Sequence, residues 1–251
     1  MAKLVEIWRH PIKSHGREYL ESVCLTAGKT LPWDRAWAVT HEKSDADGTK
    51  WVPCQNFSRG SKAPLLAAIS TVWDEANHKM TLKHPDLPNF VFDPDNVEDQ
   101  KRFIEWESPL IPDDRAQSNR LVSATERGMT DTDYASISIG NLSSHRTIEQ
   151  KFGRNLSHNR WRCNLWLEGL TPWEEFGWIG KEISIGSVTF EICERVQRCM
   201  ATTSNPETGR RDADILGILD TWGHRDFTVY AIPQNDGIIS VQDTVSGLSC
   251  N

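Results

Sequence analysis

The stretch ICERVQRCMATTSNPETGRR, from Ile192 to Arg211, has the most specific pattern in this chain. We predict that the residues leading to Cys199 form a strand, in which alternate side chains point to opposite faces of a sheet. Residues 205–208, Asn-Pro-Glu-Thr, are typical of a type I turn, because proline is favoured at its second position, and Gly209 follows. The pattern therefore places a thiol at the end of a strand, beside a polar loop. The alternative is that Cys199 is only a small buried residue.

A second group of polar residues follows the first predicted strand. Leu4 to Trp8 has the composition of a short strand, and Pro11 should end it, because proline cannot donate a hydrogen bond to a neighbouring strand. Lys13 and Ser14 would then lie on the loop that follows. A lysine ammonium and a serine hydroxyl suit the binding of an anion, although both are also common in an ordinary solvated turn.

The remaining pattern predicts a mostly β protein with few helices. Asn141 to Phe152 is the best helix candidate, because Asn141 can cap its first turn and Gly153 can end it. A shorter helix is predicted at Asp214 to Leu219. Further strands or β-like segments are predicted at Leu20–Leu25, Ala36–Thr40, Thr49–Asn56, Leu65–Trp73, Met80–Leu82, Leu121–Ser123, Trp161–Leu167, Ile183–Gly186, Val188–Ile192, Trp222–Ala231 and Ile238–Val245.

Composition divides the chain near Asn119. Proline, aspartate and asparagine dominate Pro85 to Asn96, and Ile111 to Asn119 is similar. The residues between these two stretches form an acidic patch that contains tryptophan. We predict an amino-terminal β-rich domain at residues 1–119 and a core domain at residues 120–251.

Length and composition exclude several classes of protein. The 251 residues carry a formal net charge of −7, which argues against a nucleic-acid-binding surface. No apolar run is long enough to cross a bilayer, and the amino terminus lacks the apolar core of a secretory signal, so we expect a cytoplasmic protein with no membrane contact. The cysteines show no zinc or iron–sulfur spacing, which favours free thiols in a reducing compartment. They are Cys24, Cys54, Cys163, Cys193, Cys199 and Cys250.

The stretch around Cys199 resembles the cysteine loop of MOSC domains, the family of the carboxy-terminal domain of molybdenum cofactor sulfurases. The family pattern is approximately RC, two residues, T, two residues, P, one residue and TG. Arg198-Cys199, Thr202-Thr203, Pro206 and Thr208-Gly209 match this pattern.

Other segments resemble the same family. His10 to Ser14 is similar to its Tyr-Pro-(Val/Ile)-Lys-Ser motif, with histidine in place of tyrosine, and Trp33 to Trp37 is similar to its Asp-Arg-x-Trp motif. Trp161 to Leu167 resembles a Phe-Arg-Pro-Asn segment followed by an apolar run. The loop that contains Asp133 resembles an aspartate-containing segment, although Ser136 stands where proline is common.

The resemblance implies a fold and a site. The fold would be mainly β (α+β), with a MOSC-type β-barrel core, a few helices and an N-terminal β-rich domain. Cys199 would be the protein's ligand to molybdenum, and Asp133 would handle protons or orient the substrate. The molybdenum cofactor would be bound by Lys13, Ser14, Arg35, Arg162, Asn164, Gln197, Arg198 and Thr202, with the cationic residues Lys13, Arg35 and Arg162 and the hydroxyl of Ser14 at its phosphate. Without the resemblance, Arg35 would be an exposed ion-pair partner of Asp34, and Asp133 a cap or turn residue.

Resemblance to the amidoxime-reducing components implies an oxidoreductase that reduces small N-hydroxylated compounds with a molybdenum cofactor. The chain has no iron–sulfur pattern and is short for an appended flavin or ferredoxin domain, so electrons would come from separate proteins, ferredoxin-like or cytochrome b5-like with a reductase. Two alternatives stay open: a Cys199 persulfide that carries sulfur, and a module that binds molybdopterin without catalysis. We interpret His224 as a turn residue, because nothing in the sequence couples it to Cys199.

Overall fold

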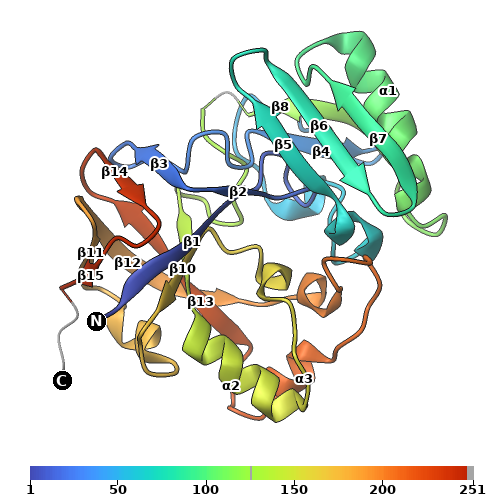
Figure 1. Cartoon of the computed structure of the whole chain (residues 1–251). Helices are drawn as coiled ribbons and strands as arrows, with labels where there is room; N and C mark the ends of the chain where they lie inside the picture. Colours follow the sequence, from blue (N-terminus) through green and yellow to red (C-terminus); the bar gives the residue numbers. More distant parts are fainter. Residues whose placement is uncertain (125, 248–251) are drawn as a thin grey trace.

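A curled sheet of eight strands forms the centre of the molecule (Figure 1). The computed structural model describes residues 1–124 and 126–247, so Cys250 lies outside the described residues. In order across the sheet, the strands are β15 (Val245–Ser246), β11 (Glu182–Ile185), β12 (Val188–Gln197), β13 (Asp226–Pro233), β9 (Ile137–Asn141), β10 (Leu165–Glu168), β1 (Lys3–Arg9) and β2 (Glu18–Leu20). Only β9 and β10 are parallel neighbours in this sheet. The predicted fold class, mainly β with few helices, is confirmed.

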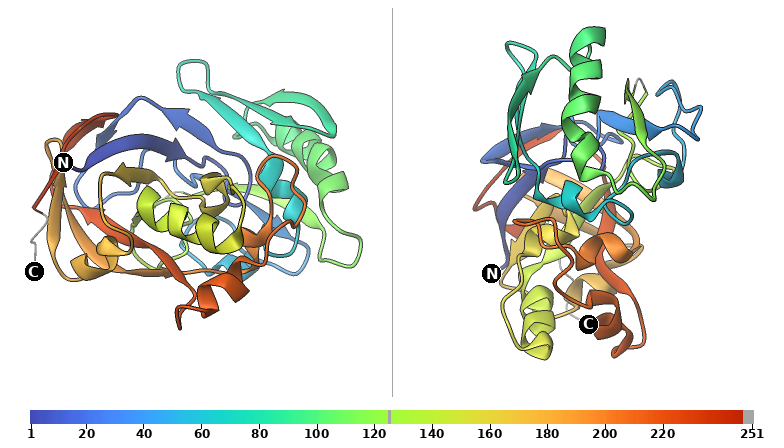
Figure 2. Two further views of the ribbon diagram at one scale, coloured as in Figure 1. Left: turned by 60° about the horizontal axis from the view of Figure 1, so that its bottom comes forward. Right: turned by 90° about the vertical axis from the view of Figure 1, so that its right-hand side faces the viewer.

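Backbone hydrogen bonds join the two ends of the chain and close the sheet on itself. Gln242 N donates to Leu4 O at 2.7 Å, and Val245 N donates to Ala2 O at 2.9 Å. The interior of the closed sheet is apolar, and α2 (Leu142–Phe152) lies beside the sheet (Figure 2), where its Ile148 packs in a separate cluster with Trp166 and Phe227. Among the completely buried side chains in the interior of the sheet are Leu4, Ile7, Ile139, Leu165, Phe190, Ile192 and Val229.

A smaller part of the molecule lies beside the curled sheet. It contains the pair β4 (Trp37–His41) and β8 (Ser118–Ser123), the sheet of β5 (Ser70–Asp74), β6 (Lys79–His84) and β7 (Leu87–Phe92), and helix α1 (Val97–Glu107). The pair β3 (Ser22–Leu25) and β14 (Gly237–Ser240) links the amino-terminal residues to the end of the chain. Residue 119, the predicted domain boundary, lies within β8. Among the described residues, no helix is both long and apolar enough to span a membrane.

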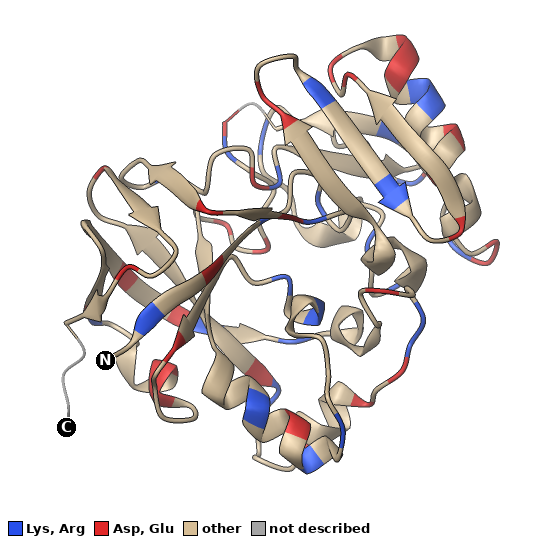
Figure 3. Ribbon diagram, viewed as in Figure 1, with Lys and Arg blue, Asp and Glu red and all other residues tan. Residues whose placement is uncertain are grey.

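Helix α1 lies in the stretch where the sequence showed only an acidic patch. The Asn96 side chain accepts hydrogen bonds from Glu98 N at 3.0 Å and Asp99 N at 3.1 Å. The acidic side chains of the first turn also interact favourably with the positive end of the helix dipole. Phe103 and Trp106 are buried, whereas acidic and basic residues alternate over the rest of the helix (Figure 3). Because the helix has so few apolar residues, the repeat of apolar positions that would predict a helix is weak in the sequence.

Two of the predicted β-like segments are wrong in part. Thr49 to Asn56 forms no strand and ends in a 3-10 turn, η1 (Cys54–Asn56). Leu65 to Trp73 begins in another 3-10 helix, η2 (Pro64–Ala68), because proline fits the first turn of a helix and cannot donate to a sheet.

Trp161 to Leu167 is extended only from Leu165 onward. Its start belongs to η4 (His158–Trp161), and Arg162 then has a left-handed backbone with φ 50°. The last predicted β pair, Ile238 to Val245, is divided between β14, which pairs with β3, and β15, which pairs with β11.

The predicted helix at Asn141 to Phe152 is confirmed as α2, with Asn141 as its cap and Gly153 at φ 82° directly after it. The Asn141 side chain accepts from Ser143 N at 2.9 Å and donates to Glu175 Oε2 at 2.8 Å. Glu175 is fully buried and also accepts hydrogen bonds from Ser144. The start of α2 therefore depends on a buried carboxyl group. The second predicted helix is α3 (Ile215–Asp220), which contacts α2.

Replacing Glu175 by glutamine should reduce the pH dependence of folding stability. Burial raises the pKa of Glu175 from 4.5 to about 7, so the folded state holds this proton more tightly than the unfolded state. The protonated Glu175 carboxyl therefore adds to the free energy of unfolding. This contribution is complete below about pH 4.5 and is lost, by on the order of 3 kcal/mol, as the pH rises through about 7. Urea unfolding between pH 4 and 8 measures the effect. The exposed Glu182→Gln is the control, and a Glu175→Gln variant with the wild-type pH slope would contradict the prediction.

Candidate functional site

Cys199 lies two residues after the end of β12, with an exposed side chain. Its carbonyl accepts hydrogen bonds from the Thr202 amide at 3.1 Å and the Thr202 hydroxyl at 2.9 Å. These bonds form the first turn of η6 (Met200–Thr203), which leads the chain away from the strand. The thiol therefore lies outside the hydrophobic core, and the alternative of a small buried residue is wrong.

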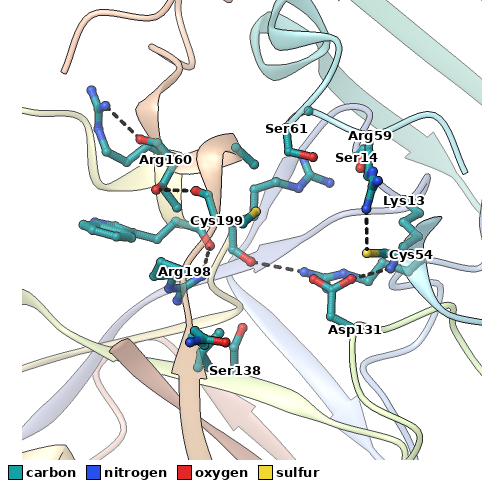
Figure 4. Close-up of a pocket in the computed structure, with 18 of the residues that line it drawn as sticks. Lys13, Ser14, Cys54, Arg59, Ser61, Asp131, Ser138, Arg160, Arg198 and Cys199 are labelled. Carbon is teal, nitrogen blue, oxygen red and sulfur yellow. Dashed lines mark hydrogen bonds and ion pairs between the residues drawn. The ribbon is translucent and has the colours of Figure 1, made fainter. Parts of the chain in front are cut away.

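Cys199 opens onto a cavity of about 190 Å³ between the curled sheet and the smaller part of the molecule (Figure 4). Eight of the ten residues predicted for the site line this cavity, although they come from positions far apart in the sequence. They are Lys13, Ser14, Arg35, Arg162, Gln197, Arg198, Cys199 and Thr202.

Asp133 and Asn164 do not line the cavity. Asp133 is exposed and lines a more open hollow, which shares Asp131, Gln197 and Tyr230 with the Cys199 cavity. Asn164 is buried, where its Oδ1 accepts from Ser138 N at 3.1 Å and Ser138 Oγ at 2.9 Å, and its Nδ2 donates to Trp8 O at 3.1 Å. Since Ser138 itself lines the cavity, Asn164 supports the wall from behind.

The acidic residue of the cavity is Asp131, two positions before the predicted one. Lys13 Nζ donates to Asp131 Oδ1 at 2.6 Å. The Asp131 side chain is 60% exposed at the mouth of the cavity. The surrounding protein removes part of its hydration, which opposes ionisation, but the charge of Lys13, together with that of Arg35, outweighs this effect and lowers the pKa of the carboxyl. Asp131 is therefore an ionised acceptor at neutral pH.

Both the side chain and the backbone of Lys13 are fixed by contacts with other residues. Its ammonium also donates to Met129 O at 2.7 Å, and its carbonyl lies 2.7 Å from Nδ1 of the buried His15. The other ring nitrogen of His15 lies 2.5 Å from a carboxylate oxygen of Glu107, which is the last residue of α1. Because His15 and Glu107 are both fully buried, the loop that carries Lys13 is fixed to α1.

Arg35 forms a buried ion pair with Asp34, rather than the exposed pair expected without the family resemblance. Asp34 is 1% exposed and accepts a hydrogen bond from His10 N at 2.7 Å. Burial raises the pKa of Asp34, but the adjacent guanidinium outweighs this and lowers it. Burial lowers the pKa of His10 to about 3, so His10 is neutral at pH 7. The free edge of Arg35 donates to Arg162 O at 3.2 Å.

Arg162 and Arg198 are partly buried and have no carboxylate within 4 Å in the described part of the chain. Arg162 donates to Gly16 O at 3.0 Å, and Arg198 donates to Trp161 O at 3.0 Å and Phe227 O at 2.8 Å. Burial, together with the charge of Arg35, lowers the pKa of Arg162 to about 9. Backbone carbonyls thus orient two guanidinium groups whose charge they compensate only partly.

The cavity is strongly positive in a chain of net charge −7. Its cationic lining residues are Lys13, Arg35, Arg59, Arg160, Arg162 and Arg198, and its one acidic lining residue is Asp131. A smaller hollow continues from it past Ser14, Arg160 and Arg162 to Ser204. The Ser204 hydroxyl is buried and has no hydrogen-bond partner among the described residues. This arrangement is suited to an anionic ligand with several acceptor atoms.

Some lining residues had not been predicted at all. Asp131 and Ser138 lie near segments that the sequence analysis had singled out, but Cys54, Arg59 and Arg160 do not belong to any motif described there. Arg160 is buried and donates to Thr202 O at 3.1 Å and to Asp212 Oδ1 at 3.2 Å, so it fixes the cysteine loop. Only the fold places these residues beside Cys199.

Residues 1–123 match the family model described as the MOSC N-terminal beta barrel domain, and residues 127–246 match the MOSC domain model. Among solved structures, the chain is similar to YiiM from Geobacillus stearothermophilus, with 17% identity over 43% of this chain and 52% of that chain and a TM-score of 0.35. It is also similar to the YuaD protein from Bacillus subtilis, with 9% identity over 98% of this chain and 94% of that chain and a TM-score of 0.43. The match to YiiM thus spans about half of that protein.

Inorganic phosphate should stabilise the ligand-free protein, and Arg162→Gln should remove most of this stabilisation. The anion would bind only to the folded state, where Arg162 has no carboxylate partner, and would add about 2.7 kcal/mol at a concentration one hundred times its Kd. For a chain of this size the melting temperature should rise by about 2–4 °C per kcal/mol. Thermal melts measure the rise. Arg146→Gln, which removes an exposed partner of Glu168, is the control, and an undiminished rise in Arg162→Gln would contradict the prediction.

Proposed function

We propose that this chain, which belongs to the MOSC domain family, binds a molybdenum cofactor and uses it to reduce small N-hydroxylated compounds. One observation carries the proposal: an exposed thiol at a strand end opens onto a cavity lined by six cationic side chains. The family is associated with molybdenum-cofactor binding. The resemblance of the chain's motifs to the amidoxime-reducing components supports the finer choice of substrate.

The donor set of the cavity fits such a cofactor. A thiolate is a soft donor that suits molybdenum, and Cys199 would supply it. The phosphate of the pterin needs cations and hydroxyl donors, which Lys13, Ser14, Arg35 and Arg162 provide. The unpartnered hydroxyl of Ser204 lies in the hollow that continues from this set. When bound, the cofactor supplies two-electron oxygen-atom chemistry.

The protein's own residues would bind the substrate and move protons. Reduction breaks the N–O bond of the substrate, consumes two electrons and two protons, and yields the N–H compound and water. We assign the proton handling to Asp131, because its carboxylate lines the cavity, whereas Asp133 does not. The Lys13 ammonium keeps Asp131 oriented at 2.6 Å. We expect separate ferredoxin-like or cytochrome b5-like proteins to deliver the electrons, and we place the reaction in the cytoplasm.

Metal content should depend on Cys199. Protein purified from a host that makes molybdopterin should contain about one molybdenum and one pterin per chain, measured by elemental analysis and pterin fluorescence, and should reduce benzamidoxime with an artificial electron donor. Cys199→Ala should abolish this reduction, because the protein would lose its direct bond to the metal. The exposed Cys24→Ala should retain it. Labile sulfur on Cys199 without metal would instead establish the sulfur carrier, and pterin binding without turnover would establish a non-catalytic module.

The two neighbouring aspartates should differ in their effect on turnover. Asp131→Asn, in metal-loaded protein, should lower kcat by about 10²-fold or more, as is typical for loss of a group that handles protons. Asp133→Asn should stay within about twofold of wild type, since exposed residues away from the reacting atoms have small effects. Steady-state kinetics across pH 5 to 9 on both variants decide the assignment. A larger loss in Asp133→Asn would return the role to that residue.

A further inference from the structure

A second cavity lies on the other side of the segment at residues 54–63. It has a volume of about 250 Å³ and opens to the surface. Its apolar lining includes the buried side chains of Phe57, Ala63 and Ile111. The segment is well fixed, because Ser58 N donates to Val39 O at 2.8 Å and the Ser58 and Ser118 hydroxyls lie 2.7 Å apart.

Basic side chains surround this apolar floor. They are His41, Lys43, Arg59, Lys62 and Arg115, and no acidic residue lines the cavity. Their existing partners are few in the part of the chain that the structure describes: Arg115 lies 3.5 Å from Asp114, Arg59 donates to Cys54 Sγ at 3.4 Å, and His41 Nε2 lies 2.9 Å from Gln55 O. Lys43 and Lys62 have no carboxylate within 4 Å among the residues that the structure describes. In a chain with a net charge of −7, a cavity whose charged lining residues are all basic indicates a binding site for a negatively charged group.

We propose that this second cavity binds a small organic anion that has an acidic group and an apolar body. The acidic group, a carboxylate or an equivalent oxyanion, would lie at the basic rim, where Lys43 and Lys62 can donate to it. The apolar body would cover Phe57 and Ile111, which removes their surface from water. A concave site of this size accommodates a one- or two-ring molecule rather than a flat protein surface.

The position of the cavity brings its ligand close to the first site. Arg59 lines both cavities, and Gly60 and Ser61 of the same segment line the one that contains Cys199. Arg211, in the cysteine loop, donates to Ser61 O at 2.8 Å. A ligand in the second cavity would therefore contact a wall shared with the Cys199 cavity. The proposal does not depend on the proposed reductase function, because the cavity and its charges exist without a cofactor.

Calorimetric titration of the full chain with 2-naphthoate tests the proposal, with 2-naphthamide and acetate as comparisons. We expect one molecule of 2-naphthoate per chain and roughly tenfold or greater loss of affinity for the amide, which lacks the charge, and for acetate, which lacks the apolar body. Lys43→Glu/Lys62→Glu should weaken naphthoate binding by about tenfold or more. Ala116→Trp, which fills the cavity without changing charge, should abolish it.

Two control variants separate this cavity from other sources of binding. Lys29→Glu/Lys83→Glu makes the same change of net charge at exposed positions outside both cavities and should leave the affinity unchanged. Arg162→Gln affects only the first cavity and its extension and should also leave it unchanged. The proposal is overturned if the amide binds as tightly as the acid, if Ala116→Trp binds normally with a wild-type unfolding midpoint, or if Arg162→Gln removes the binding.

Discussion

The positive charges of Arg162 and Arg198 are stabilised by backbone carbonyls rather than by carboxylates of the described residues, and the geometry of the site depends on this constraint. Arg35 donates to the carbonyl of Arg162, and Arg162 donates to that of Gly16. Arg198 donates to carbonyls of Trp161 and Phe227. Only a fold that brings these loops and strand ends together can satisfy the three guanidinium groups. A carbonyl dipole compensates a full charge only in part, so the cavity keeps a net attraction for anions.

The sequence predicted the residues that form local motifs better than those that the fold brings near. Lys13 and Cys199 stand next to a proline and a turn, and both line the cavity as the motifs implied. Asp131 and Asp133 are two residues apart in a polar loop, and no periodic pattern in the sequence distinguishes them. Their different surroundings arise from contacts with Lys13, which is more than one hundred residues away.

Secondary structure followed the same rule. Helix α2 has a cap, an apolar edge and a terminal glycine, and all three signals lie within thirteen residues. Helix α1 also has an asparagine cap, but its packing against β7 and β8 depends on Phe103 and Trp106, and most of its other side chains are charged. The predicted strand at Thr49–Asn56 has few apolar side chains in any regular period, and its last three residues form η1 instead, at the start of the segment where two cavities share a wall.

The closure of the sheet has a consequence for biosynthesis. Leu4 and Ala2 form backbone hydrogen bonds with residues 242 and 245, so the curled sheet cannot be completed until residue 245 has left the ribosome. Contacts this distant in sequence form late and slow the folding of small proteins. Lys13 follows the strand that waits for these partners, and Cys199 comes from the last fifth or so of the chain. The anion pocket is therefore incomplete until the strands around residue 245 have formed, and a ligand can bind in the complete pocket only after that stage.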